Sequence, residues 1–160
     1  MDTFQDFSVS TYLPVGTIAL RLVVAALLGA LIGIEREWRN RPAGLRTHML
    51  TALAAAVFTI LTGEILHSDM LQGDGTARAD PIRVIEAVTS GVAFLAAGAI
   101  IQNRRGVQGL TTGAGMWLAG SLGVAAGLGQ FVIGGLAALL GLVIIILIKR
   151  AEIAVEKTGG

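Results

Sequence analysis

Long apolar runs separated by short polar links are the feature that most constrains the fold of this 160-residue chain. There are five such runs, each 18 to 21 residues long. Because an α-helix rises about 1.5 Å per residue, roughly 20 apolar residues cross the hydrocarbon of a bilayer. With 54% hydrophobic and only 14% charged residues, the chain also has too little polar surface for a soluble domain of this size. The sequence therefore predicts an all-α protein whose main solvent is the lipid bilayer.

The five runs predict five transmembrane helices in one polytopic domain. We expect the spans at Gly16–Ile34, His48–Leu66, Ile82–Ile101, Val107–Gly127 and Phe131–Ile148. Asp80 and Pro81 are typical of a helix start, because Asp caps free backbone amides and Pro fits the first helical position. Residues 1–150 then form the transmembrane domain, and residues 151–160 form a short tail.

The basic residues lie mostly on one side of this arrangement. Of the 12 Lys and Arg residues, nine fall in the links or the tail on that side: Arg36, Arg39, Arg41, Arg46, Arg104, Arg105, Lys149, Arg150 and Lys157. Short basic loops of membrane proteins stay in the cytoplasm. The sequence therefore predicts a multi-pass protein with its N-terminus outside and its C-terminus in the cytoplasm.

Several classes of function lack the side chains they need. The net charge is +1 and the basic residues are dispersed, so there is no basic stripe for nucleic acid. The chain has no cysteine, which excludes thiolate catalysis and cysteine-based metal sites. His48 and His67 lie near opposite ends of one predicted span and cannot easily share a site. We expect neither an enzyme nor a nucleic-acid-binding protein.

Glycines are concentrated late in the chain, where ten of the 22 lie between Gly106 and Gly135. Three pairs have the four-residue spacing that places two small residues on one helix face: Gly29 with Gly33, Gly109 with Gly113, and Gly123 with Gly127. Such faces let helix backbones approach closely, within one chain or between copies of it. The alternative is the ordinary glycine enrichment of membrane helices. The pattern predicts close helix packing and allows a homo-oligomer.

Four charged side chains, Arg21, Glu64, Arg83 and Glu86, fall inside the predicted spans, where unpaired charges are costly. All four belong to the outer half of the bilayer in the predicted topology. Arg83 can meet Glu86 on one helix face, and Arg21 can reach Glu64, so we predict a charge-compensated network. The network is either the mouth of a polar cavity, in which Glu64 and Glu86 weakly ligate a hydrated Mg²⁺, or structural pairing and snorkelling near the surface. No resident cofactor is expected.

A motif at the inner end of the first span joins packed glycines to an interface of mixed charge. Acidic and basic residues alternate from Glu35 to Arg39, and Trp38 can anchor at the lipid headgroups. Similar motifs follow at intervals, and with them the chain resembles the MgtC/SapB family of bacterial inner-membrane proteins. The matching stretches are Gly29–Arg36, Ala43–Thr47, Ser90–Ile100, and Val107–Thr112 followed by Trp117.

The resemblance implies a five-span hydrophobic domain in a bacterial inner membrane. Longer members carry a further soluble domain, which these 160 residues lack. The resemblance also implies functional importance for ten residues: Glu35, Arg36, Gly44, Arg46, Thr47, Gly91, Gly98, Gly109, Thr111 and Thr112.

The resemblance further implies a role in adaptation to low Mg²⁺ and, in pathogens, in virulence through survival inside host phagocytes. Two mechanisms are implied: regulation of another membrane protein, such as a transport ATPase or ATP synthase, or transport of Mg²⁺ or another divalent cation. The charged layer is shallow, and the inner half of the spans offers mainly glycine, threonine and backbone. A transporter needs a polar route through the midplane. The sequence therefore favours the regulator.

Overall fold

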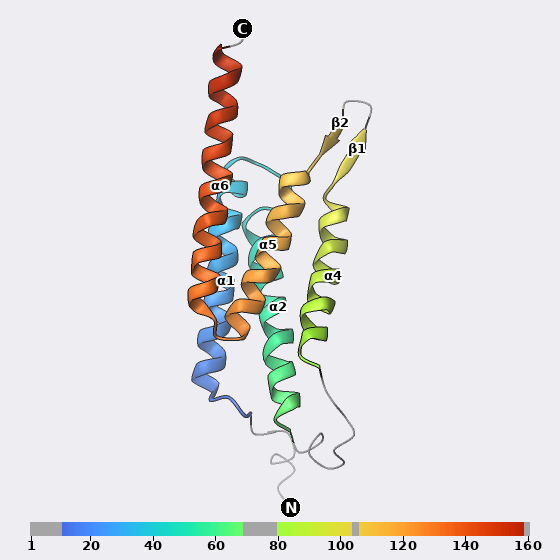
Figure 1. The fold of residues 1–160 in the computed structure, drawn as a ribbon, viewed down its shortest axis with the longest axis vertical. Coiled ribbons are helices and arrows are strands. Elements are labelled where there is room, and N and C mark those ends of the chain that lie inside the picture. Colours follow the sequence, from blue (N-terminus) through green and yellow to red (C-terminus); the bar gives the residue numbers. More distant parts are fainter. Residues whose placement is uncertain (1–10, 69–79, 104–105, 159–160) are drawn as a thin grey trace, which may run out of the picture.

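The computed structural model describes residues 11–68, 80–103 and 106–158, which form a helical bundle with one β-hairpin (Figure 1). The elements are α1 (Val15–Trp38), α2 (Leu45–Leu66), α4 (Ile82–Gly98), β1 (Ile101–Asn103), β2 (Gly106–Gln108), α5 (Leu110–Gly127) and α6 (Phe131–Thr158). β1 and β2 pair in antiparallel register. Apart from this small hairpin, the predicted all-helical architecture is confirmed in the described residues.

The structure confirms five long helices but not five membrane spans. α1 and α2 are long and apolar enough to cross a bilayer, whereas the apolar part of α6 is the shorter stretch Phe131–Leu147. α4 has 17 residues and α5 has 18, because the hairpin takes residues that were expected to be helical. At the hairpin, the third and fourth predicted spans therefore each extend three residues beyond the helix that the structure shows. Gly106 and Gly109 have positive φ angles of 119° and 88°, which interrupt a helix.

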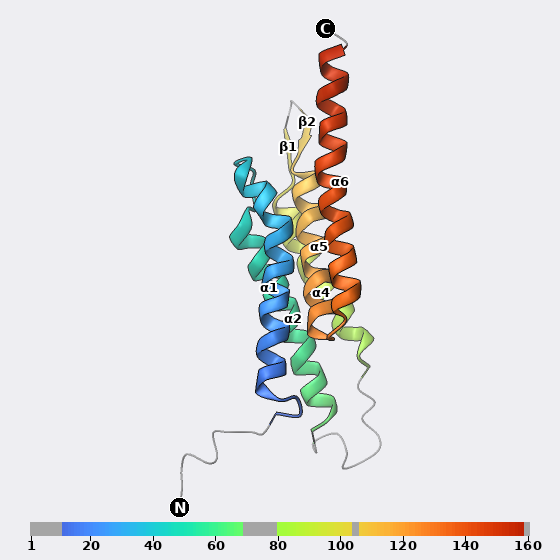
Figure 2. The ribbon, with the colours of Figure 1, turned by 90° about the vertical axis from the view of Figure 1, so that its left-hand side faces the viewer.

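α5 is the centre of the bundle and packs against α1, α2, α4 and α6. α1 also packs along α2 and α6, while α4 contacts mainly α5. The hairpin and the last turns of α6 lie at the same end of the molecule, which we call the hairpin end (Figure 2). The predicted tail of residues 151–160 continues α6 as helix up to Thr158.

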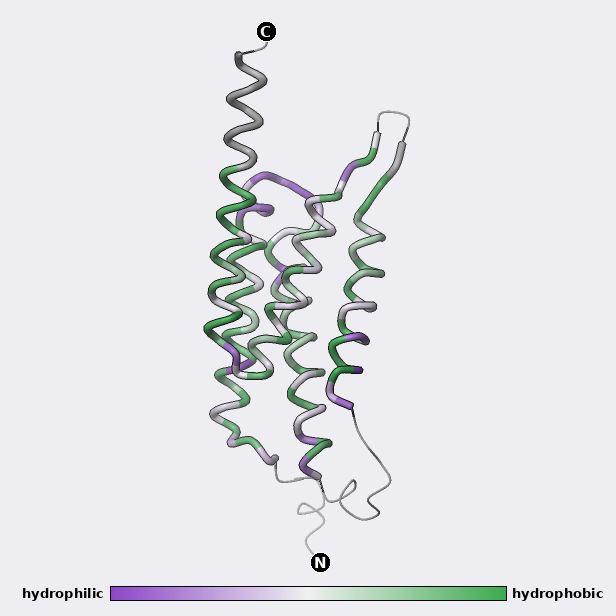
Figure 3. Tube along the Cα trace, viewed as in Figure 1, coloured by the Kyte–Doolittle hydropathy of each residue, from purple (hydrophilic) through white to green (hydrophobic). Residues whose placement is uncertain are grey.

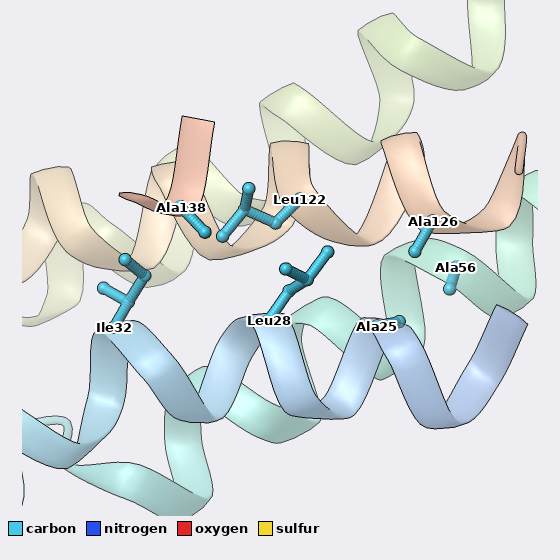
Figure 4. Packing of buried hydrophobic residues seen from close by; sticks show 7 residues of the cluster. All are labelled: Ala25, Leu28, Ile32, Ala56, Leu122, Ala126 and Ala138. Atoms are coloured by element: carbon cyan, nitrogen blue, oxygen red, sulfur yellow. The ribbon is translucent and has the colours of Figure 1, made fainter. Parts of the chain in front are cut away.

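The core of the bundle is built largely from small side chains (Figure 4). One cluster from four helices fills its centre: Ala25, Leu28, Ile32, Ala56, Leu122, Ala126 and Ala138. Many large apolar side chains point outward instead, among them Leu27, Val132 and Leu140. Figure 3 shows apolar residues along the helices and polar residues gathered towards the two ends. This distribution suits a bundle surrounded by lipid.

The glycines explain how these helices approach one another. Four of the six paired glycines lie against α2: Gly29, Gly33, Gly123 and Gly127. A Cβ on Gly29 would lie 2.5 Å from a backbone oxygen of α2, and a Cβ on Gly127 would lie 2.7 Å from a threonine Cβ of the same helix. Close packing by these two pairs is confirmed. The pair of Gly109 and Gly113 is not a helix face, because Gly109 precedes the first helical residue of α5.

Two further expectations concern the helix ends. The predicted start of the third span is confirmed, because a carboxylate oxygen of Asp80 accepts the N–H of Ile82 at 3.0 Å. Arg104 and Arg105, which were expected in a basic loop, lie outside the described residues.

Candidate functional site

A pocket of about 560 Å³ lies at the hairpin end, and we call it the hairpin-end pocket. It lies between the last turn of α1, the link that follows α1, the hairpin, the start of α5 and one face of α6. Its polar lining consists of Glu35, Arg36, Arg41, Gln108, Thr111 and Thr112, and Ile144 and Ile145 of α6 form part of an apolar wall.

Arg36 is the buried cation of this pocket. It lies in the last turn of α1 with only 7% of its surface exposed. Its Nη2 donates a hydrogen bond to Oγ1 of Thr112, which is 1% exposed on α5. Its Nε has no hydrogen-bond partner within the described part of the chain. The hydrogen bond to Thr112 links α1 to α5. Burying a charged group without a full set of partners is costly, so the free Nε of Arg36 can still bind a further acceptor.

Glu35 supplies the opposite charge beside Arg36. It is also 7% exposed, and its Oε1 forms an ion pair with Arg39 one helical turn later. Its Oε2 is buried and accepts no hydrogen bond from the described residues. The pocket lining therefore includes two neighbouring residues, one with an unused buried donor and one with an unused buried acceptor.

The start of α5 reaches the pocket through Gly109. At this residue the chain turns from the hairpin into the helix with a positive φ, and a Cβ would collide with the backbone carbonyl of Ala99. Only glycine fits both demands without strain. The first N–H groups of a helix have no partner within the helix, so the N-terminus of α5 brings free donors to the pocket beside Thr111 and Thr112.

His48 is another buried polar side chain near this end, and it is completely buried. Its Nδ1 lies 2.9 Å from the carbonyl oxygen of Gly44 on its own chain segment. Its Nε2 faces α5, where a Cβ on Gly115 would approach it to 3.0 Å, and has no hydrogen-bond partner among the residues described. His48 therefore adds a buried ionisable group at the hairpin end, where mainly glycine, threonine and backbone were expected.

A signal for this burial was present in the sequence. The buried positions of α1 are spaced three or four residues apart, from Ala25 through Leu28 and Ile32 to Arg36. That spacing continues one apolar helix face into the charged motif. Glu35 and Arg36, which were expected at an interface of mixed charge, therefore continue the buried face of α1.

The ten residues highlighted by the family resemblance fall into three groups. Five line the hairpin-end pocket: Glu35, Arg36, Gly109, Thr111 and Thr112. Gly44, Arg46 and Thr47 lie around the start of α2, and Glu37 accepts the N–H of Leu45 there at 3.0 Å. Gly91 and Gly98 lie on α4, where a Cβ would meet nothing within 4 Å. The structure thus gathers half of the motif residues into one pocket.

The four membrane-depth charges do not form the predicted network. Arg21 donates to the carbonyl oxygen of Gly127 at 2.7 Å. Glu64 accepts two backbone N–H groups that precede α1, at 2.6 and 3.1 Å, and Arg83 and Glu86 are exposed on α4. Within residues 11–68, 80–103 and 106–158, no ion pair joins these four side chains. Backbone groups compete with side chains for these charges: a carbonyl at the end of α5 for Arg21, and two N–H groups before α1 for Glu64.

The described residues do not offer a ready metal centre. They contain no group of three or more His, Asp or Glu side chains placed to hold an ion. Both carboxylate oxygens of Glu64 already accept amide protons. Mg²⁺ prefers an octahedral set of oxygens, so the described residues do not fit a resident Mg²⁺ ion. Weak ligation by Glu64 and Glu86 stays a prediction.

The fold and the pocket define a helical membrane protein with a buried polar site at one end of its bundle. The sequence profile of the MgtC family matches residues 22–153, and the chain belongs to this family. The predicted resemblance is therefore confirmed.

Three relatives illustrate the similarity. The chain is 45% identical over 112 residues to protein MgtC of Salmonella typhimurium strain LT2, a match that covers 70% of this chain and 44% of that protein. It is 40% identical over 112 residues to an uncharacterized protein of Synechocystis, with the same shares. It is 36% identical over 115 residues to "Putative magnesium transporter YhiD" of Escherichia coli K12, covering 72% of this chain and 53% of that protein. The chain thus matches about half the length of these relatives, and no solved structure matches it.

Proposed function

We propose that this chain is an inner-membrane protein of bacteria that acts in adaptation to low Mg²⁺ by regulating another membrane protein. The five long helices would be its spans, with the hairpin end in the cytoplasm and the start of α1 outside. The basic residues Arg36, Arg39, Arg41 and Arg46 near the hairpin end support this orientation. The magnesium-related name of the E. coli relative supports the link to Mg²⁺. In a pathogen, the same adaptation would serve virulence and survival inside host cells.

The observation that carries the regulatory mechanism is the closed centre of the bundle. The hairpin-end pocket holds the buried charges Glu35 and Arg36, whereas a cluster of seven buried apolar side chains fills the centre of the bundle (Figure 4). At the opposite end, Arg21 and Glu64 are bound to backbone groups. A conduit needs a polar route through the midplane, so this arrangement favours a binding site at one end. The partner class that we expect is a transport ATPase or ATP synthase.

A divalent-cation transporter is the second candidate, and one observation favours it. Glu35 and His48 have buried polar atoms with no hydrogen-bond partner in the described chain, and both lie on helices long enough to cross a membrane. Buried ionisable groups on membrane-spanning helices often mark ion pathways. For Glu35 and His48 to line an ion pathway, the helices would need a second arrangement in which the apolar core is open.

Copurification from cells grown in low Mg²⁺ tests the regulatory mechanism. The tagged chain is extracted in mild detergent, and bound ATPase or ATP synthase subunits are measured by mass spectrometry. We expect the Arg41→Gln variant to retain at most a fifth of the partner, because Arg41 is exposed at the hairpin end. The charge-matched control is Arg83→Gln, which alters an exposed arginine of α4 at the opposite end and should retain the partner fully. Equal losses in the two variants, or no enrichment with the unmodified chain, would refute the proposal.

A further inference from the structure

The hairpin-end pocket has a net positive lining. Three charged side chains face it: Glu35, Arg36 and Arg41. Glu35 is already neutralised by its ion pair with Arg39, so the charge that remains in the pocket is that of the two arginines. An anionic ligand is therefore favoured over a cation.

The donors of the pocket suit a phosphate group. Arg36 lines the pocket with only 7% of its surface exposed, and its buried Nε has no partner in the described chain, although its Nη2 is used by Thr112. The N-terminus of the 18-residue helix α5 lies in the same lining and adds free backbone N–H groups and a partial positive charge. A guanidinium beside a helix N-terminus is a strong phosphate-binding combination.

Glu35 restricts which phosphate compounds fit the pocket. Its unused Oε2 is buried and repels a second anionic group, but it can accept a hydrogen bond from a hydroxyl. The ligand should therefore present a phosphate towards Arg36 and a hydroxyl towards Glu35. A phosphate that carries a small polyol meets both conditions.

Part of the remaining lining is apolar. Ile144 and Ile145 of α6 and Ile101 and Val107 of the hairpin contribute to it. The volume of about 560 Å³ is in the usual range for a small-molecule site. A wall of this kind suits a molecule with a polar head and an apolar body.

From these observations we propose that the hairpin-end pocket binds a phosphate group with a neighbouring hydroxyl. The source is either the headgroup of a phosphatidylglycerol in the bilayer or a soluble glycerol phosphate. This proposal does not depend on whether the protein regulates a partner or transports an ion.

Native mass spectrometry of the purified chain in neutral detergent tests the proposal. An equimolar mixture of phosphatidylglycerol and phosphatidylcholine is offered, and glycerol 3-phosphate is offered separately. We expect one phosphatidylglycerol per chain, with affinity reduced about tenfold by Arg36→Gln or Arg41→Gln, which corresponds to about 1.4 kcal/mol. Arg41 is exposed, so Arg41→Gln keeps the bond of Arg36 to Thr112 and should still fold if Arg36→Gln does not. The charge-matched control is Arg46→Gln, because Arg46 is exposed at the same end but outside the pocket.

Phosphatidylethanol tests the hydroxyl, because it has the charge of phosphatidylglycerol and no headgroup hydroxyl. We expect it to bind about fivefold more weakly, and equal binding would overturn the role of Glu35. Binding of glycerol 3-phosphate with the same dependence on Arg41 would support the site and identify a soluble source. Equal retention of phosphatidylcholine, or an equal loss of binding in Arg46→Gln, would overturn the proposal. None of these results depends on a protein partner, so this proposal and the proposed function fail separately.

Discussion

The two adjacent threonines at the start of α5 offer the sharpest test of the buried bond between α1 and α5. Thr112 is 1% exposed and accepts a hydrogen bond from Arg36, whereas Thr111 is exposed in the same pocket. Replacing either by valine keeps the shape and removes the hydroxyl. Only Thr112→Val should remove a bond between helices.

The expected loss follows from the charge of the donor. Neutral hydrogen bonds between membrane helices contribute about 0.6 kcal/mol on average. Hydrogen bonds to charged groups contribute about 1.5–3 kcal/mol, and both partners here are almost fully buried. Thr112→Val also leaves two nitrogens of Arg36 without a partner in the described chain. We therefore expect Thr112→Val to lower the free energy of unfolding by about 1.5–3 kcal/mol.

Reversible unfolding by sodium dodecyl sulfate from maltoside micelles, followed by far-UV circular dichroism, measures this quantity. Thr111→Val should change the free energy of unfolding by less than about 0.5 kcal/mol, as exposed substitutions usually do. Equal losses in the two variants, or a loss below about 0.6 kcal/mol in Thr112→Val, would refute the assignment of the buried bond.

Three further predictions use matched positions. Gly123→Ala should lower the free energy of unfolding by about 1–3 kcal/mol, because the added Cβ collides with the backbone of α2. The control is Gly135→Ala, whose added Cβ meets nothing within 4 Å and should not destabilise the protein. The same unfolding titration compares the two variants. Gly109→Ala should cost about 1–3 kcal/mol in that titration because of its positive φ, and a neutral effect would argue against the turn into α5. Glu64→Gln should speed hydrogen exchange about tenfold at the amides of Tyr12 and Leu13, which donate hydrogen bonds to Glu64. Glu86→Gln should leave the exchange of these amides unchanged. Equal exchange rates in the two variants would contradict the contact.

The helices were predictable because bilayer thickness fixes the length of an apolar run. α1 and α2 begin and end within a few residues of their predicted spans. The hairpin was not predictable from hydropathy, because each strand has only three residues with one apolar side chain, Ile101 or Val107, which is too short to show an alternating pattern. Gly106 and Gly109 were visible in the sequence, but their positive φ angles were not.

The site was only partly predictable, for a different physical reason. Glu35, Arg36 and Thr112 stood out as residues of the family motifs. They share a pocket because α1 and α5 are neighbours, and local sequence patterns do not predict which helices pack together. The predicted pairing of Arg21 with Glu64 failed because charge alone does not choose between a side chain and a free backbone group. The carbonyl groups in the last turn of α5 and the N–H groups before α1 offer such partners, and the spacing of charges along the sequence does not reveal them.

Mg²⁺ flux into liposomes that contain only the purified chain is the most direct test of the regulatory mechanism. We expect uptake no faster than in protein-free liposomes, because an apolar core lies beyond the hairpin-end pocket. Rapid uptake that is abolished by Glu35→Gln, or by neutralising Glu64 and Glu86 together, would contradict it and establish a transporter.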